Sequence, residues 1–350
     1  MSRSALSDRL LRFLSHQPRP ESLLIMTHDH PDPDAMASAF ALAYLASRVY
    51  GIRIKMVYGG AIGRMENRTM VDVLRIPVSA LAPEDLTAFQ HVALVDTQPP
   101  FGNNSFPGDR TAYLVIDHHP RHRRTRAGLV LIQTRFGATT TILAQALSSF
   151  KRRLPTRLAT AMAYGIASET QNLGREAGAR DIEAYLALLP RCDMRLLGRM
   201  QHPRRSRSFF RTVGHAMQNA FLFGRLIGVH LEEVETPDLV AQLADFLVAC
   251  QGVRWSICTG RYQGRLHVSL RLAQPGAVEA GTLLSRTLGK RGRAGGHGMI
   301  AGGSLELPPD AGEPDWRHIE QWVVRRLTQR LQDRPVARVA WPFRSKRRPS

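Results

Sequence analysis

The sequence predicts an α/β protein with a parallel-sheet N-terminal domain and a second, smaller domain of mixed α/β structure. Short apolar runs alternate with helical stretches, which favours parallel strands joined by right-handed crossovers. Several of these runs end at clusters of carboxylates and imidazoles, where open parallel sheets bind ligands. The length of 350 residues exceeds what one hydrophobic core usually organises. We therefore expect two domains with an active-site cleft between them.

The first domain begins with an apolar strand, expected at residues 22–26, that ends at the first polar cluster. Asp34 then opens an alanine-rich helix that we expect to run to Tyr50. The further strands are expected at 52–58, 91–95 and 112–116. The further helices are expected near 65–75, 83–90, 138–150 and 156–168. The last of these helices delivers Glu169.

The second domain follows a change of composition after Pro190. The stretch 202–211 is basic and carries a proline, which suits a linker. Later strands are expected at 226–231, 254–259, 266–272 and 299–305, helices at 237–249, 277–288 and 315–331, and a glycine-rich loop at 292–298. The predicted parts are therefore a first domain over 1–195, a basic linker over 196–222, a second domain over 223–332 and a basic, mobile tail over 333–350.

Composition indicates a soluble cytoplasmic protein with no stable membrane association. Three cysteines are too few and too far apart for a disulfide framework or a thiolate metal site, so we expect reduced thiols. The N-terminus lacks a signal-peptide core, and the charge-free apolar stretch 35–47 is too short to span a membrane.

The net charge of +19 favours an anionic partner such as a nucleotide or nucleic acid. Arginines cluster at 121–124, 204–207 and 344–348, and these clusters are better candidates for contacts than the average charge. The alternative is that the arginines form an ordinary solvated surface.

The polar clusters at the strand ends predict a shared metal site. His28, Asp32 and Asp34 follow the first strand, Asp96 follows a later one, and His118 and His119 follow the next. Buried carboxylates at neighbouring strand ends are costly unless they are paired or bound to a cation. Mixed imidazole and carboxylate ligands suit Mn²⁺, with Mg²⁺, Co²⁺ or Zn²⁺ as alternatives. Taken singly, each cluster could instead cap a helix or lie on the surface.

In order and spacing, these motifs resemble those of the DHH phosphoesterase superfamily, whose name-giving motif stands here as Asp117-His118-His119. Gly295-Gly296-His297, followed by Ile300-Ala301-Gly302-Gly303, resembles the signature of the DHH-associated C-terminal domain. The resemblance covers residues 20–306 and is most like the nanoRNase and 3′-phosphoadenosine-5′-phosphate phosphatase group.

The resemblance implies a role for each matching residue. Two divalent cations would be held by six residues, with Asp96 as the bridge: His28, Asp32, Asp34, Asp96, His118 and Glu169. His119 would face the substrate phosphate and Asp117 would orient its neighbours, while His30 is either catalytic or packed in its loop. Substrate would be bound by Arg271, Gly295, Gly296 and His297, although the alternative for Arg271 is a solvated charge at a strand end.

The function implied is metal-dependent hydrolysis of short oligoribonucleotides or small nucleotides, with short RNA or a nucleotide as the partner. One alternative is a pyrophosphate or polyphosphate hydrolase. The other is a catalytically weakened protein that binds RNA or a cyclic dinucleotide, because Glu169 stands where the family pattern has aspartate. A homodimer remains open.

Overall fold

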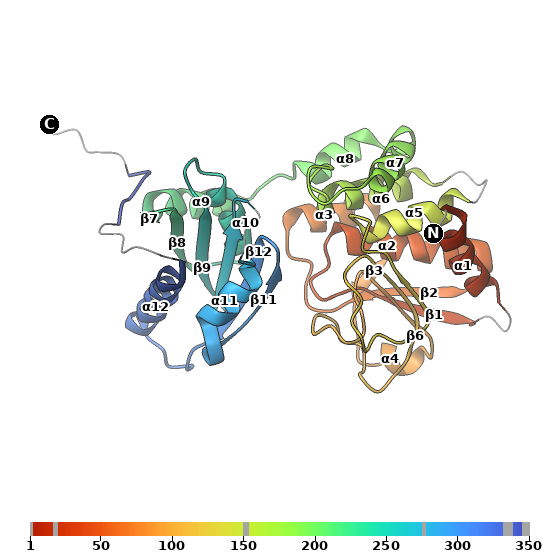
Figure 1. Ribbon diagram of the computed structural model, residues 1–350, viewed down its shortest axis with the longest axis horizontal. Helices are drawn as coiled ribbons and strands as arrows, with labels where there is room; N and C mark the ends of the chain where they lie inside the picture. The colour runs from red at the N-terminus through yellow and green to blue at the C-terminus, as the bar shows by residue number, and fades with distance from the viewer. Residues whose placement is uncertain (1–2, 17–19, 150–153, 275–277, 332–338, 345–350) are drawn as a thin grey trace. The chain divides into compact units, whose positions relative to one another are not determined.

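The computed structural model describes residues 3–16, 20–149, 154–274, 278–331 and 339–344 (Figure 1). It divides into two compact units, Met1–Pro203 and Arg204–Ser350. The first is built on a parallel sheet and the second on a mixed sheet, which confirms the predicted fold class. The predicted domain boundaries and the cleft between the domains stay predictions.

The sheet of the first unit has six parallel strands in the order β3-β2-β1-β4-β5-β6. The strands are β1 Ser22–Met26, β2 Arg53–Tyr58, β3 Val78–Ala80, β4 Val92–Val95, β5 Ala112–Asp117 and β6 Ala127–Ile132. Strands β2 and β3 are added on one side of β1, and strands β4, β5 and β6 are then added on its other side. Ligands of open α/β sheets bind beyond the carboxyl ends of the strands where the order reverses, here at β1 and β4.

Most helices cover one face of this sheet, where α2, α5 and α6 gather, whereas α4 lies on the other side (Figure 1). The helices are α1 Arg3–Ser15, α2 Pro33–Tyr44, α3 Met65–Leu74, α4 Asp85–Ala88, α5 Thr139–Ser148, α6 Thr156–Glu169, α7 Ala179–Leu188 and α8 Met194–Gln201, with a π-helical turn Leu45–Val49 after α2 and a 3₁₀ turn Leu189–Arg191 after α7. A Cβ atom at Gly165 of α6 would lie only 2.9 Å from Ala37 Cβ of α2. Small residues therefore let these two helices approach closely.

The strands of this sheet bury alternate residues on its two faces. Leu23 and Ile25 of β1 belong to the core beneath the helices, whereas Leu24 and Met26 belong to a smaller core with Phe106 on the other face. Burial on both faces explains why β1 is apolar from Leu23 to Met26.

The sheet of the second unit runs in the order β11-β12-β10-β9-β8-β7, with only the β8–β9 pairing parallel. The strands are β7 Phe221–Phe223, β8 Leu226–Glu233, β9 Trp255–Tyr262, β10 Arg265–Leu272, β11 Gly292–His297 and β12 Ile300–Glu306. The helices are α9 Arg207–Asn219, α10 Asp238–Val248, α11 Ala280–Leu288 and α12 Glu313–Leu331, with a 3₁₀ turn Gly289–Arg291 after α11.

One local prediction in this region was wrong. The glycine-rich segment 292–298, predicted as a loop, is mainly strand β11, which pairs with β12 and turns at Gly298. Much of the stretch expected as a linker is helical, because Ser206 caps α9 by accepting the Phe209 N–H at 3.1 Å. Part of the expected tail is also held, since Ala340 pairs with Leu222 of β7.

Buried arginines in the second unit have matched carboxylates. Arg261 of β9 donates to Glu320 through Nε at 2.9 Å and Nη2 at 3.1 Å, and it also contacts Glu313. This arrangement ties α12 to the sheet. Among the described residues, none of the helices is long and apolar enough to cross a membrane.

Candidate metal centre

The predicted cluster residues meet at the carboxyl edge of the first sheet. His28 lies just beyond β1, Asp96 directly follows β4, and Asp117 ends β5 with His118 and His119 next to it. These three strands are neighbours, so the clusters come together as the sequence predicts.

Asp96 lies at the middle of this cluster. Its Oδ2 is 3.6 Å from His28 Nε2, and its Oδ1 is 3.7 Å from His118 Nε2. Asp32 Oδ2 is 3.8 Å from the same His28 nitrogen. Among the described residues, His28, Asp32 and Asp96 form one group that could hold a metal ion, and Asp96, His118 and His119 form another. The two groups share Asp96 and approach it through different oxygens.

The orientation of two histidines fits metal binding. His28 Nδ1 lies 2.8 Å from the Asp29 carbonyl oxygen, and His118 Nδ1 lies 3.2 Å from that of Phe136. A carbonyl can only accept, so each Nδ1 carries the hydrogen, and Nε2 is the nitrogen through which either ring would ligate a cation. His118 Nε2 is buried without a hydrogen-bond partner in the described part of the chain. A cation would satisfy this nitrogen.

Asp32 and Asp34 are positioned by the start of α2. Asp32 caps the helix by accepting the Ala35 N–H at 2.9 Å. Asp34 is fully buried and accepts the N–H groups of Thr139 and Thr140, at 2.7 and 2.8 Å, from the start of α5. Burial and the neighbouring Asp96 raise the pKa of Asp34 to about 7. Asp34 lies outside the two groups of described residues above, so its role as a ligand stays a prediction.

The backbone and side chain of Asp96 are both constrained. Its φ of 59° lies in the left-handed region, which is uncommon for a residue other than glycine. Thr139 Oγ1 donates to Asp96 Oδ1 at 2.7 Å. Burial acts to raise the pKa of Asp96, but the neighbouring His28, His118 and His119 outweigh burial and lower that pKa.

Glu169 ends α6 and faces the same negative charges. Burial, followed by the charges of Asp32, Asp34 and Asp96, raises the pKa of Glu169 to about 9. This repulsion is what a bound cation would relieve. Glu169 also lies outside the two groups of described residues, so its predicted role as a ligand stays a prediction.

Arg175 is a neighbour of this site that the motifs did not reveal. Its Nη2 donates to the Glu169 carbonyl at 2.9 Å and lies 3.6 Å from Glu169 Oε1. The loop that carries it holds several residues at positive φ: Gln171, Asn172, Leu173 and Glu176. Strained backbone of this kind clusters at functional sites. The signal in the sequence was only one arginine shortly after Glu169.

Asp117 holds His119 in place. Its Oδ1 is 2.9 Å from His119 Nδ1, and its Oδ2 accepts from Gln98 Nε2 at 2.7 Å. Burial acts to lower the pKa of His119, but Asp117 and Asp96 outweigh it and raise that pKa to about 9. Because Nδ1 is engaged by Asp117, His119 is a weaker ligand candidate than His118 although it belongs to the second group. Gln98 was not predicted.

His30 lies against the loop that follows β2. Its Nδ1 is 3.1 Å from the Ala61 carbonyl oxygen, and a Cβ atom at Gly60 would lie 2.6 Å from the ring. These contacts match the loop-packing alternative, and a catalytic role for His30 stays a prediction.

The predicted substrate-binding residues belong to the second unit. Arg271 is buried, contacts Asp245, and donates through Nη1 to Ser269 Oγ at 2.7 Å and to the Ala301 carbonyl at 3.1 Å. Gly295 and Gly296 lie in β11, where Gly296 has a φ of 149° and a Cβ atom would lie 2.2 Å from the Ile300 carbonyl oxygen. The His297 side chain lies outside the described parts of the structure. Substrate binding by these four residues stays a prediction.

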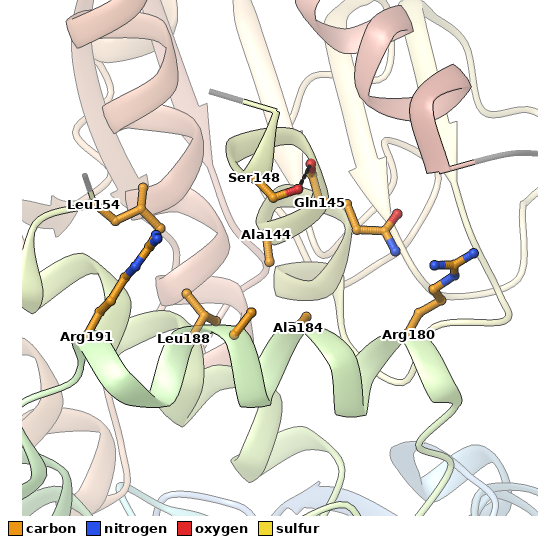
Figure 2. Close-up of a pocket in the computed structure, with 9 residues that line it drawn as sticks. Ala144, Gln145, Ser148, Leu154, Arg180, Ala184, Leu188 and Arg191 are labelled. Atoms are coloured by element: carbon orange, nitrogen blue, oxygen red, sulfur yellow. Dashed lines mark hydrogen bonds between the residues drawn. The ribbon is translucent and has the colours of Figure 1, made fainter. Parts of the chain in front are cut away.

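A small pocket elsewhere in the first unit has different chemistry (Figure 2). It lies between α5 and α7, with Arg180 and Arg191 at its two ends and mostly aliphatic side chains between them. None of its lining residues is acidic or a histidine, so this pocket is not a second metal centre.

Comparison with known proteins agrees with the motifs. Residues 22–166 match the model of the DHH family, N-terminal domain. The chain is 31% identical over 287 residues to an uncharacterized protein of Methanocaldococcus jannaschii, a match that covers 81% of the chain and 58% of that protein. The fold is similar to that of an exopolyphosphatase-related protein from Bacteroides fragilis, with a TM-score of 0.72 and 14% identity over 94% of this chain and 98% of the other. The segment that matches the DHH model lies within the first unit and contains the motifs from His28 to His119.

Proposed function

We propose that this protein is a metal-dependent phosphoesterase that hydrolyses short oligoribonucleotides or small nucleotides. The observation that carries the proposal is the shared carboxylate of Asp96, which offers one oxygen to each of two groups of metal-ligand type. A carboxylate in this position suits a binuclear site for phosphoryl hydrolysis.

Six residues would hold the cations. His28 and Asp32 would hold one, and Asp34, His118 and Glu169 the other, with Asp96 common to both. Oxygen and imidazole donors suit Mn²⁺ best, and Mg²⁺ or Co²⁺ would also be accepted. When bound, two divalent cations polarise a phosphoryl oxygen and lower the pKa of an attacking water.

The remaining residues would position the substrate. His119, fixed through Nδ1 by Asp117, would donate to a non-bridging phosphate oxygen. Arg175 would neutralise charge at the edge of the site, because its guanidinium already lies beside Glu169. The preference for nucleotides rests on the resemblance of Gly295-Gly296-His297 to the family signature and on the net charge of +19.

A substrate panel tests the proposal. With Mn²⁺ present, we expect turnover of di- to penta-ribonucleotides or 3′-phosphoadenosine 5′-phosphate to exceed turnover of pyrophosphate, polyphosphate and cyclic dinucleotides. Asp32→Ala should abolish this turnover and weaken Mn²⁺ binding in calorimetry. The matched control is Asp72→Ala, since Asp72 is an exposed aspartate on α3.

Each other outcome points to a different function. Turnover of pyrophosphate or polyphosphate alone would replace the nucleotide assignment with a phosphoanhydride hydrolase. Tight binding of a cyclic dinucleotide or RNA without turnover of any substrate would replace the enzyme with a sensor. Full activity in folded Asp32→Ala would contradict the binuclear assignment.

A further inference from the structure

One face of α9 carries arginines and a phenylalanine exposed to solvent. Arg207, Phe210, Arg211, Gly214 and Gln218 are all exposed, and their spacing places them along one stripe of the helix. The opposite side of α9 packs into the core through Val213, Ala216 and Met217. Phe210 is 63% exposed, which is unusual for a phenylalanine on a helix that has an apolar core to pack against.

The described C-terminal segment, residues 339–344, extends this stripe. Ala340 is joined to Leu222 of β7 by two backbone hydrogen bonds of 2.7 and 2.9 Å. Arg344 Nε donates to the carbonyl of Gln218, the last residue of the stripe, at 3.1 Å. The segment is therefore held at the C-terminal end of α9.

The same segment adds two more exposed aromatic rings. Trp341 is 47% exposed and Phe343 is 40% exposed. The Arg344 guanidinium lies 4.9 Å from the centre of the Trp341 ring, which keeps this cation next to the aromatic surface. We name the combined surface the aromatic–arginine face: it consists of Arg207, Phe210, Arg211, Trp341, Phe343 and Arg344.

We propose that the aromatic–arginine face binds single-stranded RNA. Exposed aromatic rings stack on unpaired bases, and arginines beside them contact the phosphates, which is how proteins hold single strands without reading sequence. The face itself carries three arginines and no aspartate or glutamate, although Glu235 contacts Ser208 at the start of α9, so its charge complements a polyanion. A duplex would not satisfy the rings, because its bases are already stacked. This binding does not depend on the metal centre.

Fluorescence anisotropy on the full-length protein tests the inference. A labelled 12-nucleotide oligoadenylate and a duplex of the same length are titrated in EDTA, so that hydrolysis plays no part. We expect tighter binding of the single strand, and an increase in Kd of about tenfold for Phe210→Ala and for Trp341→Ala, since stacking contributes roughly 1–3 kcal/mol per base. Arg211→Gln should lower the salt dependence of binding.

Matched variants separate stacking from general surface effects. Phe210→Trp should bind at least as tightly as the parent, whereas Phe210→Leu, which keeps apolar area but loses the ring, should bind as weakly as Phe210→Ala. Leu186→Ala removes a side chain that is 57% exposed on α7 and should leave Kd unchanged. Arg325→Gln removes an exposed charge from α12 and should leave the salt dependence unchanged.

Several outcomes would overturn the inference. Equal affinity for strand and duplex, or parent-like Kd values in folded Phe210→Ala and Trp341→Ala, would show that the rings do not stack on bases. Binding of anionic lipid vesicles without binding of the oligonucleotide would replace RNA with a membrane surface. Turnover of a dinucleotide is measured in parallel and should be the same in all these variants, so failure of the RNA face and failure of the proposed phosphoesterase are distinguishable.

Discussion

The two units differ in whether their buried charged side chains have partners of opposite charge. In the second unit, Arg261 is buried with Glu320 and Glu313 as partners, so the positive charge is matched within the fold. In the first unit, the carboxylates of Asp34 and Asp96 are buried near Asp32 and Glu169, and burial together with the charges of these aspartates raises the pKa of Glu169. Buried charge that is matched holds structure together, whereas unmatched charge of one sign predicts a ligand of the other sign.

This difference also revises how Arg271 is understood. An arginine at this point in the sequence suggested contact with a substrate phosphate. In the structure its guanidinium contacts Asp245 and donates to Ser269, which is how a structural arginine behaves. The substrate role of Arg271 must therefore compete with these internal contacts.

The largest effect that we expect on the buried charges of the first unit comes from substituting Asp96. We expect Asp96→Asn to lower Mn²⁺-dependent turnover by about 10³-fold, because a change of several kcal/mol at a binuclear site corresponds to that factor. In EDTA its melting temperature should fall only slightly, because asparagine keeps an oxygen to accept from Thr139 although it loses the negative charge beside the histidines. Turnover and thermal melting measure the two effects, with Asp72→Asn as control. A large fall in stability would mean that Asp96 is a structural residue.

In the second unit, substituting one member of the Arg261–Glu320 pair should lower stability instead of turnover. Arg261→Met should destabilise this unit by about 3–5 kcal/mol, because Glu320 would be left buried without its partner. Urea denaturation measures this loss. The double variant Arg261→Met, Glu320→Leu should recover much of it. If the single variant unfolds like the parent, the buried pair does not contribute to stability.

His230 tests whether the second unit excludes unmatched charge. Burial and the nearby Arg261 lower the pKa of His230 to about 4, so the folded protein keeps this ring neutral. As the pH falls below 6.5, His230 binds a proton in the unfolded chain before it does so in the folded protein. The free energy of unfolding should therefore decrease by about 3 kcal/mol between pH 6.5 and pH 4. Urea denaturation at several pH values should show this slope, and His230→Gln should flatten it. An equal slope in both proteins would assign the effect to another group.

The smallest expected effect in the first unit concerns whether Glu169 is a metal ligand. Glu169→Asp should keep measurable turnover, whereas Glu169→Gln should weaken Mn²⁺ binding by about tenfold or more, because a negative ligand is lost. Mn²⁺ titration and turnover are measured together. Parent-like binding in the Gln variant would place Glu169 outside the metal site. If the parent is inert and Glu169→Asp confers activity, the sensor alternative is correct.

The sequence predicted strongly patterned elements best. Strand β1 has the predicted bounds, and the polar clusters after β1, β4 and β5 meet as expected because parallel strands bring their carboxyl ends to one edge. Strand β3 is short and largely exposed, so it has no apolar pattern to detect. Strand β11 is rich in glycine, a residue depleted from strands, and its pairing with β12 outweighs that preference.

Parts of the metal centre were invisible in the sequence for another reason. Thr139 donates to Asp96, Gln98 to Asp117 and Arg175 to Glu169, and each is a common polar residue that lies outside the family motifs. Only the folded chain shows that these side chains face the clusters. Sequence patterns indicate which residues offer charge, but the contacts that orient that charge come from tertiary structure.

The backbone conformation of Asp96 lowers the stability of the fold, but it holds a carboxylate that the proposed metal centre needs. Its φ of 59° favours glycine, and a residue with a side chain held there costs about 1–2 kcal/mol. A glycine at this position would relax the backbone but would leave no carboxylate to bridge the two groups. Asp96→Gly should therefore have no turnover, and its relaxed backbone should offset part of the stability lost with the Thr139 contact, so that it melts no lower than Asp96→Ala.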